Sequence, residues 1–274
     1  MTGNVGDKVL EWLRTTGYPL ELRIGSQLQL AQWHVNYGRR YSDAESGKNR
    51  ELDIHALVAA IHPKTASIFF SLCIECKTSS KPWVALSGDR TLGNAGLQEI
   101  AMGPLSEMTL IAARSEKVPL PPLFPSTTPV VGGVIQAFGG QDEGSPVSPY
   151  AALMQARSAA FALDASYFKT AKVVSNDLTT TGIFLPIVVF DGTLLRYSIQ
   201  NDLQEHIEEV DMIMAVVPGD ASHADALVPV ITASHAVAMG EQFFAHAHAF
   251  CVTMLPHSSL IQAALEMDLG YSDT

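Results

Sequence analysis

Residues 51–77 carry the most informative pattern in the chain and read ELDIHALVAAIHPKTASIFFSLCIECK. Polar and apolar residues alternate over 51–56, which is typical of a half-buried β-strand. After a proline-containing break, residues 68–77 form a second extended stretch that stays apolar until Glu75 and Lys77. Because side chains alternate along a strand, Glu75 and Lys77 share one face. The sequence therefore predicts two successive strands, the second of which ends in a charged pair.

The polar residues of these two strands are candidates for a charged site. If the strands pair, Asp53 projects near Glu75, and Lys77 lies roughly 6.6 Å further along the same face. Two neighbouring carboxylates raise each other's pKa unless a cation neutralises them, and their oxygens suit a hard divalent ion such as Mg²⁺. A lysine beside them is placed to counter negative charge that develops on a phosphate. The pattern therefore predicts a metal site with an adjacent ammonium group.

Two helices are expected before these strands. Residues 8–13 have the apolar spacing of a short amphipathic helix. A second helix is expected to begin at Pro19, because proline suits the first helical turn. Glu21 lies at the edge of the apolar face of this second helix. The two apolar faces consist of Val9, Trp12 and Leu13 in the first helix and Leu20, Ile24, Leu28 and Ala31 in the second.

The rest of the chain is expected to complete one α/β domain over residues 1–274. Residues 118–149 are rich in proline and glycine and are expected to be irregular. A long helix is expected from Ser148, and buried strands over 184–189 and 212–217. The predicted order is two helices, three strands, the irregular stretch, then helix, strand, strand, helix and strand. That order predicts a mixed sheet with helices on both faces.

Composition excludes several classes of protein. Hydrophobic residues make up 47% of the chain and charged residues 16%, which excludes a disordered or coiled-coil protein. The net charge of −11 excludes a generally basic nucleic-acid coat and a polybasic membrane anchor. Residues 1–90 hold 11 of the 17 basic residues but only 9 of the 28 acidic ones, so an anion-binding face is expected there. Neither a signal peptide nor an apolar run of membrane length is visible, so we expect a cytoplasmic protein with no membrane partner.

A family resemblance follows from the residues singled out above. Asp53 and Glu75-x-Lys77 on successive strands, with Glu21 in the preceding helix, resemble the PD-(D/E)XK restriction-endonuclease-like superfamily of nucleases. The resemblance covers residues 8–86 well and is weaker beyond them. Leu52 precedes Asp53, so the proline that gives the motif its first letter is absent. The stretches similar to a bacterial branch of this superfamily are Gly17–Glu21, Arg50–Ile54 and Ile74–Val84.

The resemblance implies a restriction-endonuclease-like mixed central sheet flanked by helices. The implied catalytic core covers residues 8–90 and 148–217, with an irregular insertion over 118–149.

In that family the matching residues have defined roles. The resemblance implies that Asp53 and Glu75 bind Mg²⁺, with Mn²⁺ as a substitute, and that Lys77 is the catalytic lysine. Glu21 would assist with the metal directly or through water. The implied function is a metal-dependent endonuclease that hydrolyses phosphodiester bonds in DNA, in bacterial defence or repair. The implied form is a homodimer or part of a larger assembly.

Glu21 and several basic residues also have ordinary structural explanations. Glu21 equally fits a first-turn acidic residue that complements the helix dipole. Arg50 and Lys81 are candidates for phosphate contacts or are ordinary surface charges near turns. For the pair Arg39-Arg40 the surface explanation is preferred.

Cysteines and histidines raise a separate question of metal binding. Cys73 and Cys76 are expected on opposite faces of one strand, so packing is preferred over a zinc or redox role. His246 and His248 would share a face if that segment were extended. With His235 and His257 nearby a metal site is conceivable, but structural histidines are preferred.

A rival function belongs to a different class. A catalytically inactive module of the same fold would bind nucleic acid or a partner protein without cutting. An RNA substrate is a third alternative, for which the sequence shows no aromatic stacking motif.

Overall fold

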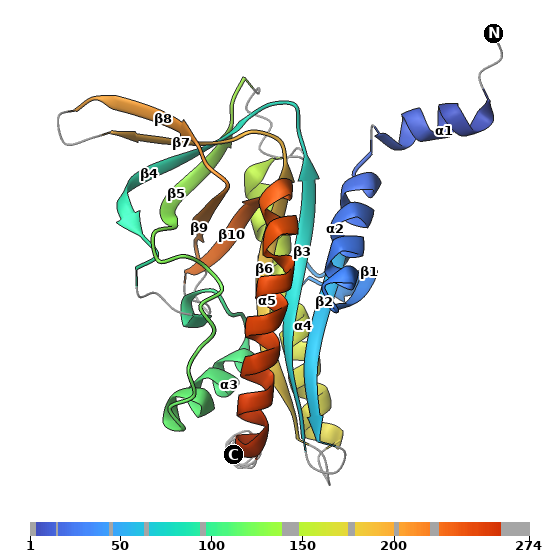
Figure 1. Ribbon diagram of the computed structural model, residues 1–274, viewed down its shortest axis with the longest axis vertical. Helices are drawn as coiled ribbons and strands as arrows, with labels where there is room; N and C mark the ends of the chain where they lie inside the picture. Colours follow the sequence, from blue (N-terminus) through green and yellow to red (C-terminus); the bar gives the residue numbers. More distant parts are fainter. Residues whose placement is uncertain are drawn as a thin grey trace.

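The computed structural model describes residues 4–14, 16–43, 46–62, 66–93, 97–138, 148–174, 179–199, 203–219 and 225–258 (Figure 1). Its helices are α1 (Val5–Arg14), α2 (Tyr18–Leu30), α3 (Pro104–Ser115), α4 (Pro149–Val174) and α5 (Ala233–Met254), with short 3₁₀ helices at Leu97–Glu99 and Leu255–His257. Its strands are β1 (His34–Ser42), β2 (Asn49–His62), β3 (Ala66–Thr78), β4 (Trp83–Thr91), β5 (Pro129–Gln136), β6 (Thr179–Asp191), β7 (Leu194–Ile199), β8 (Glu205–Glu209), β9 (Met212–Val217) and β10 (Ala226–Thr232).

The described strands form one mixed sheet in the order β1-β2-β3-β6-β10-β9-β5-β4-β7-β8. β2 pairs with β1 and β3 in antiparallel fashion, whereas β3 pairs with β6 in parallel along the whole of both strands. β3 is therefore an interior strand, and its residues 66–76 read as an almost unbroken buried run. The predicted mixed α/β sheet is confirmed.

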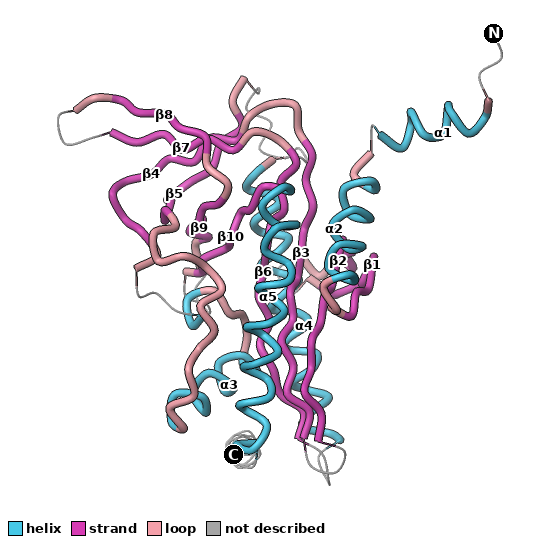
Figure 2. Tube along the Cα trace, in the orientation of Figure 1, coloured by secondary structure: helices cyan, strands magenta, loops and turns pink. Residues whose placement is uncertain are grey.

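Helices cover both faces of the central part of the sheet, as predicted (Figures 1 and 2). α2 and α5 pack on one face, where Ile24 and Phe250 belong to the same buried cluster as Phe70 of β3. α4 packs on the other face, where Ala159 lies in a cluster with Phe184 of β6. None of the described helices is long and apolar enough to cross a lipid bilayer.

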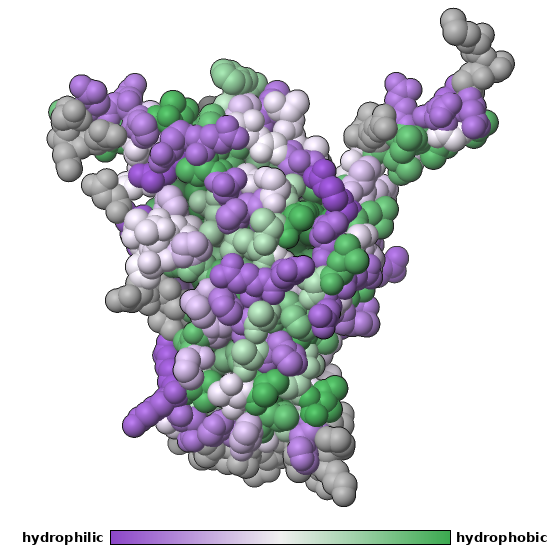
Figure 3. All heavy atoms as spheres, viewed as in Figure 1, coloured by the Kyte–Doolittle hydropathy of each residue, from purple (hydrophilic) through white to green (hydrophobic). Residues whose placement is uncertain are grey.

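The two N-terminal helices behave differently. α2 begins one residue before Pro19 and buries Leu20, Ile24 and Leu28, as the apolar spacing predicted. α1 forms where residues 8–13 predicted a helix, but it projects away from the sheet in Figure 1. Val9 is 46% exposed, and Figure 3 shows apolar side chains along the outside of this helix. The periodicity identified the helix correctly but not whether its apolar face is covered.

The expected irregular stretch over 118–149 is wrong for its middle part. Residues 129–136 form β5, an interior strand between β9 and β4. Gly132 and Gly133 lie within this strand, and the β4–β5 pairing has a register shift between Leu86 and Ser87. A bulge of this kind explains how a glycine pair that resembles a turn is kept inside a sheet. Residues 139–147 lie outside the described part of the chain.

The predicted element order also needs correction at three places. β7 and β8 were not expected, and both lie between β6 and β9. β4 and α3 were not expected either, and both lie between β3 and β5. Near the C-terminus the last strand, β10, precedes the last helix, α5, rather than following it. The expected strands over 184–189 and 212–217 are present as β6 and β9.

Candidate active site

The candidate site lies where β2 and β3 separate. Their ladder runs from the pair His62–Ala66 to the pair Ile54–Ile74. Beyond it, the Asp53 carboxylate takes the place of a backbone partner, because its Oδ2 accepts a hydrogen bond from the Cys76 N–H at 2.7 Å. Asp53 is thereby fixed against the end of β3, beside the residues on either side of Cys76.

Glu75 and Lys77 form an ion pair on one face of β3. Lys77 Nζ lies 2.6 Å from Glu75 Oε1. The Glu75 side chain is 5% exposed and that of Lys77 15%, so the pair is largely removed from water. The parallel neighbour β6 holds this end of β3 through the pairs Glu75–Val188 and Lys77–Phe190. The predicted meeting of Asp53, Glu75 and Lys77 is therefore observed.

The electrostatics of the carboxyl groups connect Glu21 to this set. Burial, followed by the charge of Asp53, raises the pKa of Glu21 to about 7, while Lys77 opposes the shift. Burial and Asp53 likewise raise the pKa of Glu75 to about 7. Burial also raises the pKa of Asp53, against the effect of the Cys76 N–H and Lys77. The first turn of α2 thus brings a third carboxyl group within electrostatic reach of the other two.

Lys77 remains a cation in this environment. Burial alone would lower its pKa, but Glu75 and Asp53 outweigh burial and raise the pKa of the ammonium group. Three carboxyl groups therefore lie near one fixed positive charge. When these groups are ionised, negative charge is in excess, and a divalent cation would balance it.

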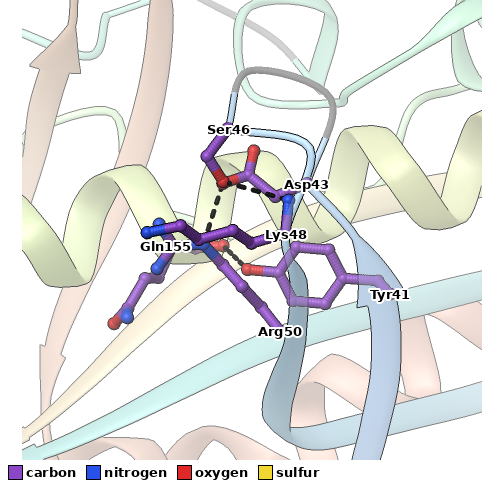
Figure 4. Close-up of polar contacts among 6 residues, drawn as sticks. All are labelled: Tyr41, Asp43, Ser46, Lys48, Arg50 and Gln155. Carbon is purple, nitrogen blue, oxygen red and sulfur yellow. Dashed lines mark hydrogen bonds and ion pairs between the residues drawn. The ribbon is translucent and has the colours of Figure 1, made fainter.

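The candidate phosphate-binding residues have different surroundings. Arg50 Nε lies 2.8 Å from Asp43 Oδ2, which also accepts a hydrogen bond from Ser46 Oγ at 2.6 Å (Figure 4). Arg50 is thus held by an ion pair at the turn between β1 and β2. Lys81 is exposed in the loop after β3, where its backbone N–H donates to Ser79 Oγ at 3.0 Å.

Tyr41 is a neighbour of the site that the sequence pattern did not identify. Its hydroxyl donates to the Gln155 carbonyl oxygen at 3.4 Å, and both residues are labelled in Figure 4. Burial, followed by the charge of Glu75, raises the pKa of Tyr41. Among the described residues, Gln155 Oε1 is buried without a hydrogen-bond partner. These residues come from β1 and α4, so no local spacing could have pointed to them.

Arg39, for which an ordinary surface charge was preferred, is partly exposed and contacts an aromatic ring. Its guanidinium lies 5.5 Å from the centre of the Tyr167 ring. Burial, followed by the charge of Arg39, lowers the pKa of His55 to about 4. Arg40 is exposed, as expected.

The other metal candidates do not form a site within the described residues. Cys73 and Cys76 are both buried and belong to clusters on opposite faces of the sheet, which confirms packing. His246 and His248 lie on the helix α5, so the extended geometry considered for them is wrong. His248 stacks on Phe244. His257 Nδ1 lies 3.0 Å from Glu116 Oε2.

The acidic set fits a hard cation through two ligands rather than a full cage. Within the described residues no group of three or more His, Cys, Asp or Glu has the geometry of a metal centre. Mg²⁺ commonly binds through one or two carboxylates and keeps several waters. Asp53 and Glu75 each use one oxygen in the hydrogen bonds described above, and oxygen donors of this kind match Mg²⁺ and Mn²⁺.

Comparison of the chain with protein-family models, with curated proteins and with solved structures finds no match. Any functional assignment therefore depends on the site residues themselves.

The raised pKa values predict how stability depends on pH. A carboxyl group whose pKa is higher in the folded than in the unfolded chain binds its proton more tightly when folded. The resulting stabilisation is full below about pH 4.5 and is lost as the pH rises to about 7. Asp53→Asn removes one of the repelling charges and keeps an oxygen for the Cys76 N–H, so we expect it to reduce this loss.

Thermal unfolding in EDTA between pH 5 and pH 8 measures the effect. The melting temperature of Asp53→Asn should exceed that of the wild type by several degrees at pH 8 and by less at pH 5, at about 2–4 °C per kcal/mol. Glu241→Gln, at an exposed position of α5, should run parallel to the wild type. Equal differences at both pH values would contradict the expectation.

Proposed function

We propose that this chain is a metal-dependent nuclease that hydrolyses phosphodiester bonds in DNA. The observation that supports this most directly is the buried set of Asp53, Glu75 and Lys77 at the end of β3, with Glu21 in electrostatic reach. Clustered carboxyl groups with strongly shifted pKa values are typical of functional sites. An ammonium group beside them is suited to a reaction in which negative charge accumulates on phosphate oxygens.

The roles of the residues follow from their chemistry. Asp53 and Glu75 would hold Mg²⁺ or Mn²⁺, which supplies a Lewis acid for the phosphoryl oxygens when bound. Lys77 would counter the charge that develops as water attacks phosphorus. Glu21, whose pKa is about 7, is suited to accept the proton released by that water. The phosphorus–oxygen bond to the leaving nucleotide then breaks, and the leaving oxygen takes up a proton from solvent.

Cleavage assays test this function directly. Purified protein is incubated with supercoiled plasmid, linear duplex and single-stranded DNA in Mg²⁺, Mn²⁺ or EDTA. Nicking or linearisation with either metal, and none in EDTA, is the expected result. Cleavage that persists in EDTA would rule out the metal-dependent mechanism. Gel filtration of the same sample tests the proposed homodimer.

Metal binding is expected to stabilise the fold measurably. At a metal concentration of 100 times Kd, binding to the folded state alone adds about 2.7 kcal/mol. We expect Mg²⁺ or Mn²⁺ to raise the melting temperature of the wild type by about 5–10 °C. In Glu75→Gln, which keeps the size of the side chain and removes its charge, the rise should be small. An equal rise in both proteins would place the bound metal elsewhere.

The second candidate function is a catalytically inactive module of the same kind, binding nucleic acid or a partner protein. The ion pair between Glu75 and Lys77 favours it, because the ammonium group already balances one of the carboxylates. Calorimetric titration with Mg²⁺ and Mn²⁺ separates the two functions. An inactive module of this kind need show no heat of metal binding at millimolar concentration.

A further inference from the structure

Phe138 is an exposed aromatic residue with an unusual backbone. Phe138 is large and apolar, yet it is 89% exposed. Its φ of +54° lies in the left-handed region, which costs a non-glycine residue free energy. Backbone conformations of this kind are concentrated at functional sites, where the surrounding structure maintains them.

The position of Phe138 is fixed by contacts to the loop that follows Lys77. The neighbouring Ala137 N–H donates to the Pro82 carbonyl oxygen at 2.9 Å. Gln136, the last residue of β5, donates from Nε2 to Ser79 Oγ at 2.9 Å. Because residues 79–82 directly continue β3, these two bonds connect the end of β5 to the strand that carries Glu75 and Lys77.

Figure 1 shows the same relation at a larger scale. The loop between β3 and β4 and the end of β5 lie at the upper end of the view, where α2 also begins. The end of β3, which carries Glu75 and Lys77, and the end of β5, which Phe138 follows, therefore belong to one end of the molecule. The exposed Lys81 lies in the connecting loop between them.

Charge gives an uncharged contact with the substrate a clear use. A chain with net charge −11 can make few phosphate contacts, and Arg50, one of the candidates, is held by Asp43. Stacking of a nucleobase on an aromatic ring strengthens binding and needs no positive charge. A base can stack in this way only when its face is free, which excludes the interior of a regular duplex.

We propose that Phe138 is a stacking platform for an unpaired nucleobase and that the substrate is DNA with a single-stranded segment. This inference rests on the proposed nuclease function and specifies its substrate. The base on Phe138 belongs to the strand whose phosphodiester bond lies at Asp53, Glu75 and Lys77.

The chain offers a matched control for Phe138. Leu203, between β7 and β8, is also a large apolar residue, 83% exposed, with a φ of +62°. It lies in the connection between β7 and β8, the two strands at one end of the strand order, whereas β3 is separated from β7 by five strands. Both alanine variants therefore remove a highly exposed apolar side chain from a residue with positive φ, and only Phe138→Ala removes an aromatic ring.

Binding is measured by fluorescence anisotropy in a Lys77→Ala background, so that the DNA stays intact. The probes are a fluorescein-labelled oligothymidine and a duplex of the same length, both with Mg²⁺. Phe138→Ala should weaken oligothymidine binding about 10-fold. Duplex binding should change less than twofold. Phe138→Tyr should restore the affinity, and Leu203→Ala should leave it unchanged.

Two results would overturn the inference. One is an unchanged affinity of Phe138→Ala for oligothymidine. The other is a loss of affinity that is not selective, either because Phe138→Ala binds the duplex equally less well or because Leu203→Ala loses as much oligothymidine affinity as Phe138→Ala. Cleavage by the otherwise wild-type protein is assayed in parallel. If the otherwise wild-type protein cleaves DNA with metal but Phe138→Ala keeps its affinity, the stacking role is wrong and the nuclease function is supported. Absence of cleavage with a selective loss of oligothymidine binding removes the nuclease and leaves Phe138 as a binding residue.

Discussion

Lys77→Ala is expected to reduce DNA cleavage by at least about 100-fold to 1,000-fold, the range found when one electrostatic stabiliser of a transition state is removed. The ammonium group is the fixed cation beside the buried carboxyl groups, 2.6 Å from Glu75 Oε1. The fold should survive, because the Glu75 carboxyl, with a pKa of about 7, can take up a proton once its partner is lost. The rate of plasmid nicking in Mg²⁺ measures the effect, and circular dichroism checks the fold.

Lys81→Ala is the matched control for this prediction. It removes the same charge from the loop that follows β3, at an exposed position. Its effect on nicking should be only a few-fold, because an exposed lysine contributes through weak, screened attraction to phosphates. If Lys77→Ala cut DNA as fast as the wild type, the catalytic role of Lys77 would be wrong. A large loss in Lys81→Ala alone would move that role to the loop.

Of the substitutions considered, Asp164→Ala is expected to cause the largest loss of stability, about 3–5 kcal/mol in the free energy of unfolding. Asp164 of α4 is fully buried. Its carboxylate accepts from the Leu105 N–H at 2.9 Å, and from the Ser106 N–H at 2.8 Å and the Ser106 hydroxyl at 2.6 Å. Ser106 Oγ in turn accepts from the Phe184 N–H at 2.9 Å, so one carboxylate joins α4, α3 and β6. Alanine would leave these buried donors without their acceptor.

Urea unfolding at pH 7 measures this effect. Asp164→Asn is the comparison variant, because it keeps the shape of the side chain and one acceptor oxygen. Its loss of stability should be clearly smaller than that of the alanine variant. A loss below about 1 kcal/mol in Asp164→Ala would show that the network contributes little.

The parts of the fold that could be predicted are those whose information is local. α2 has one apolar stripe and a proline at its first turn, and both signals lie within the helix itself. β2 and β3 alternate or run apolar over enough residues to be recognised, and their order along the chain brings Asp53 to Glu75. The acidic set could be anticipated for this reason, because the two strands are consecutive in the chain and pair with each other.

The parts that were missed depend on distant residues. β5 contains glycines that indicate a turn locally, and only its neighbours β4 and β9 make it a strand. Tyr41 was missed because its contacts are distant in the chain: its hydroxyl donates to Gln155 of α4, more than a hundred residues later, and Glu75 of β3 acts on its pKa. The exposure of the apolar face of α1 could not be predicted for the same reason. Periodicity shows where an apolar face lies on a helix but not what covers it.

The parallel pairing of β3 with β6 has a consequence for the order in which the protein is made and folds. β2 and β3 leave the ribosome together as a hairpin, whereas β6 begins only at Thr179. Closing the long connection between Thr78 and Thr179 is entropically costly and slows folding relative to the hairpin. The acidic residues are therefore synthesised early, but β3 acquires its second neighbour late. A nascent chain that stops before β6 carries every candidate catalytic side chain and lacks the strand that holds β3 in place.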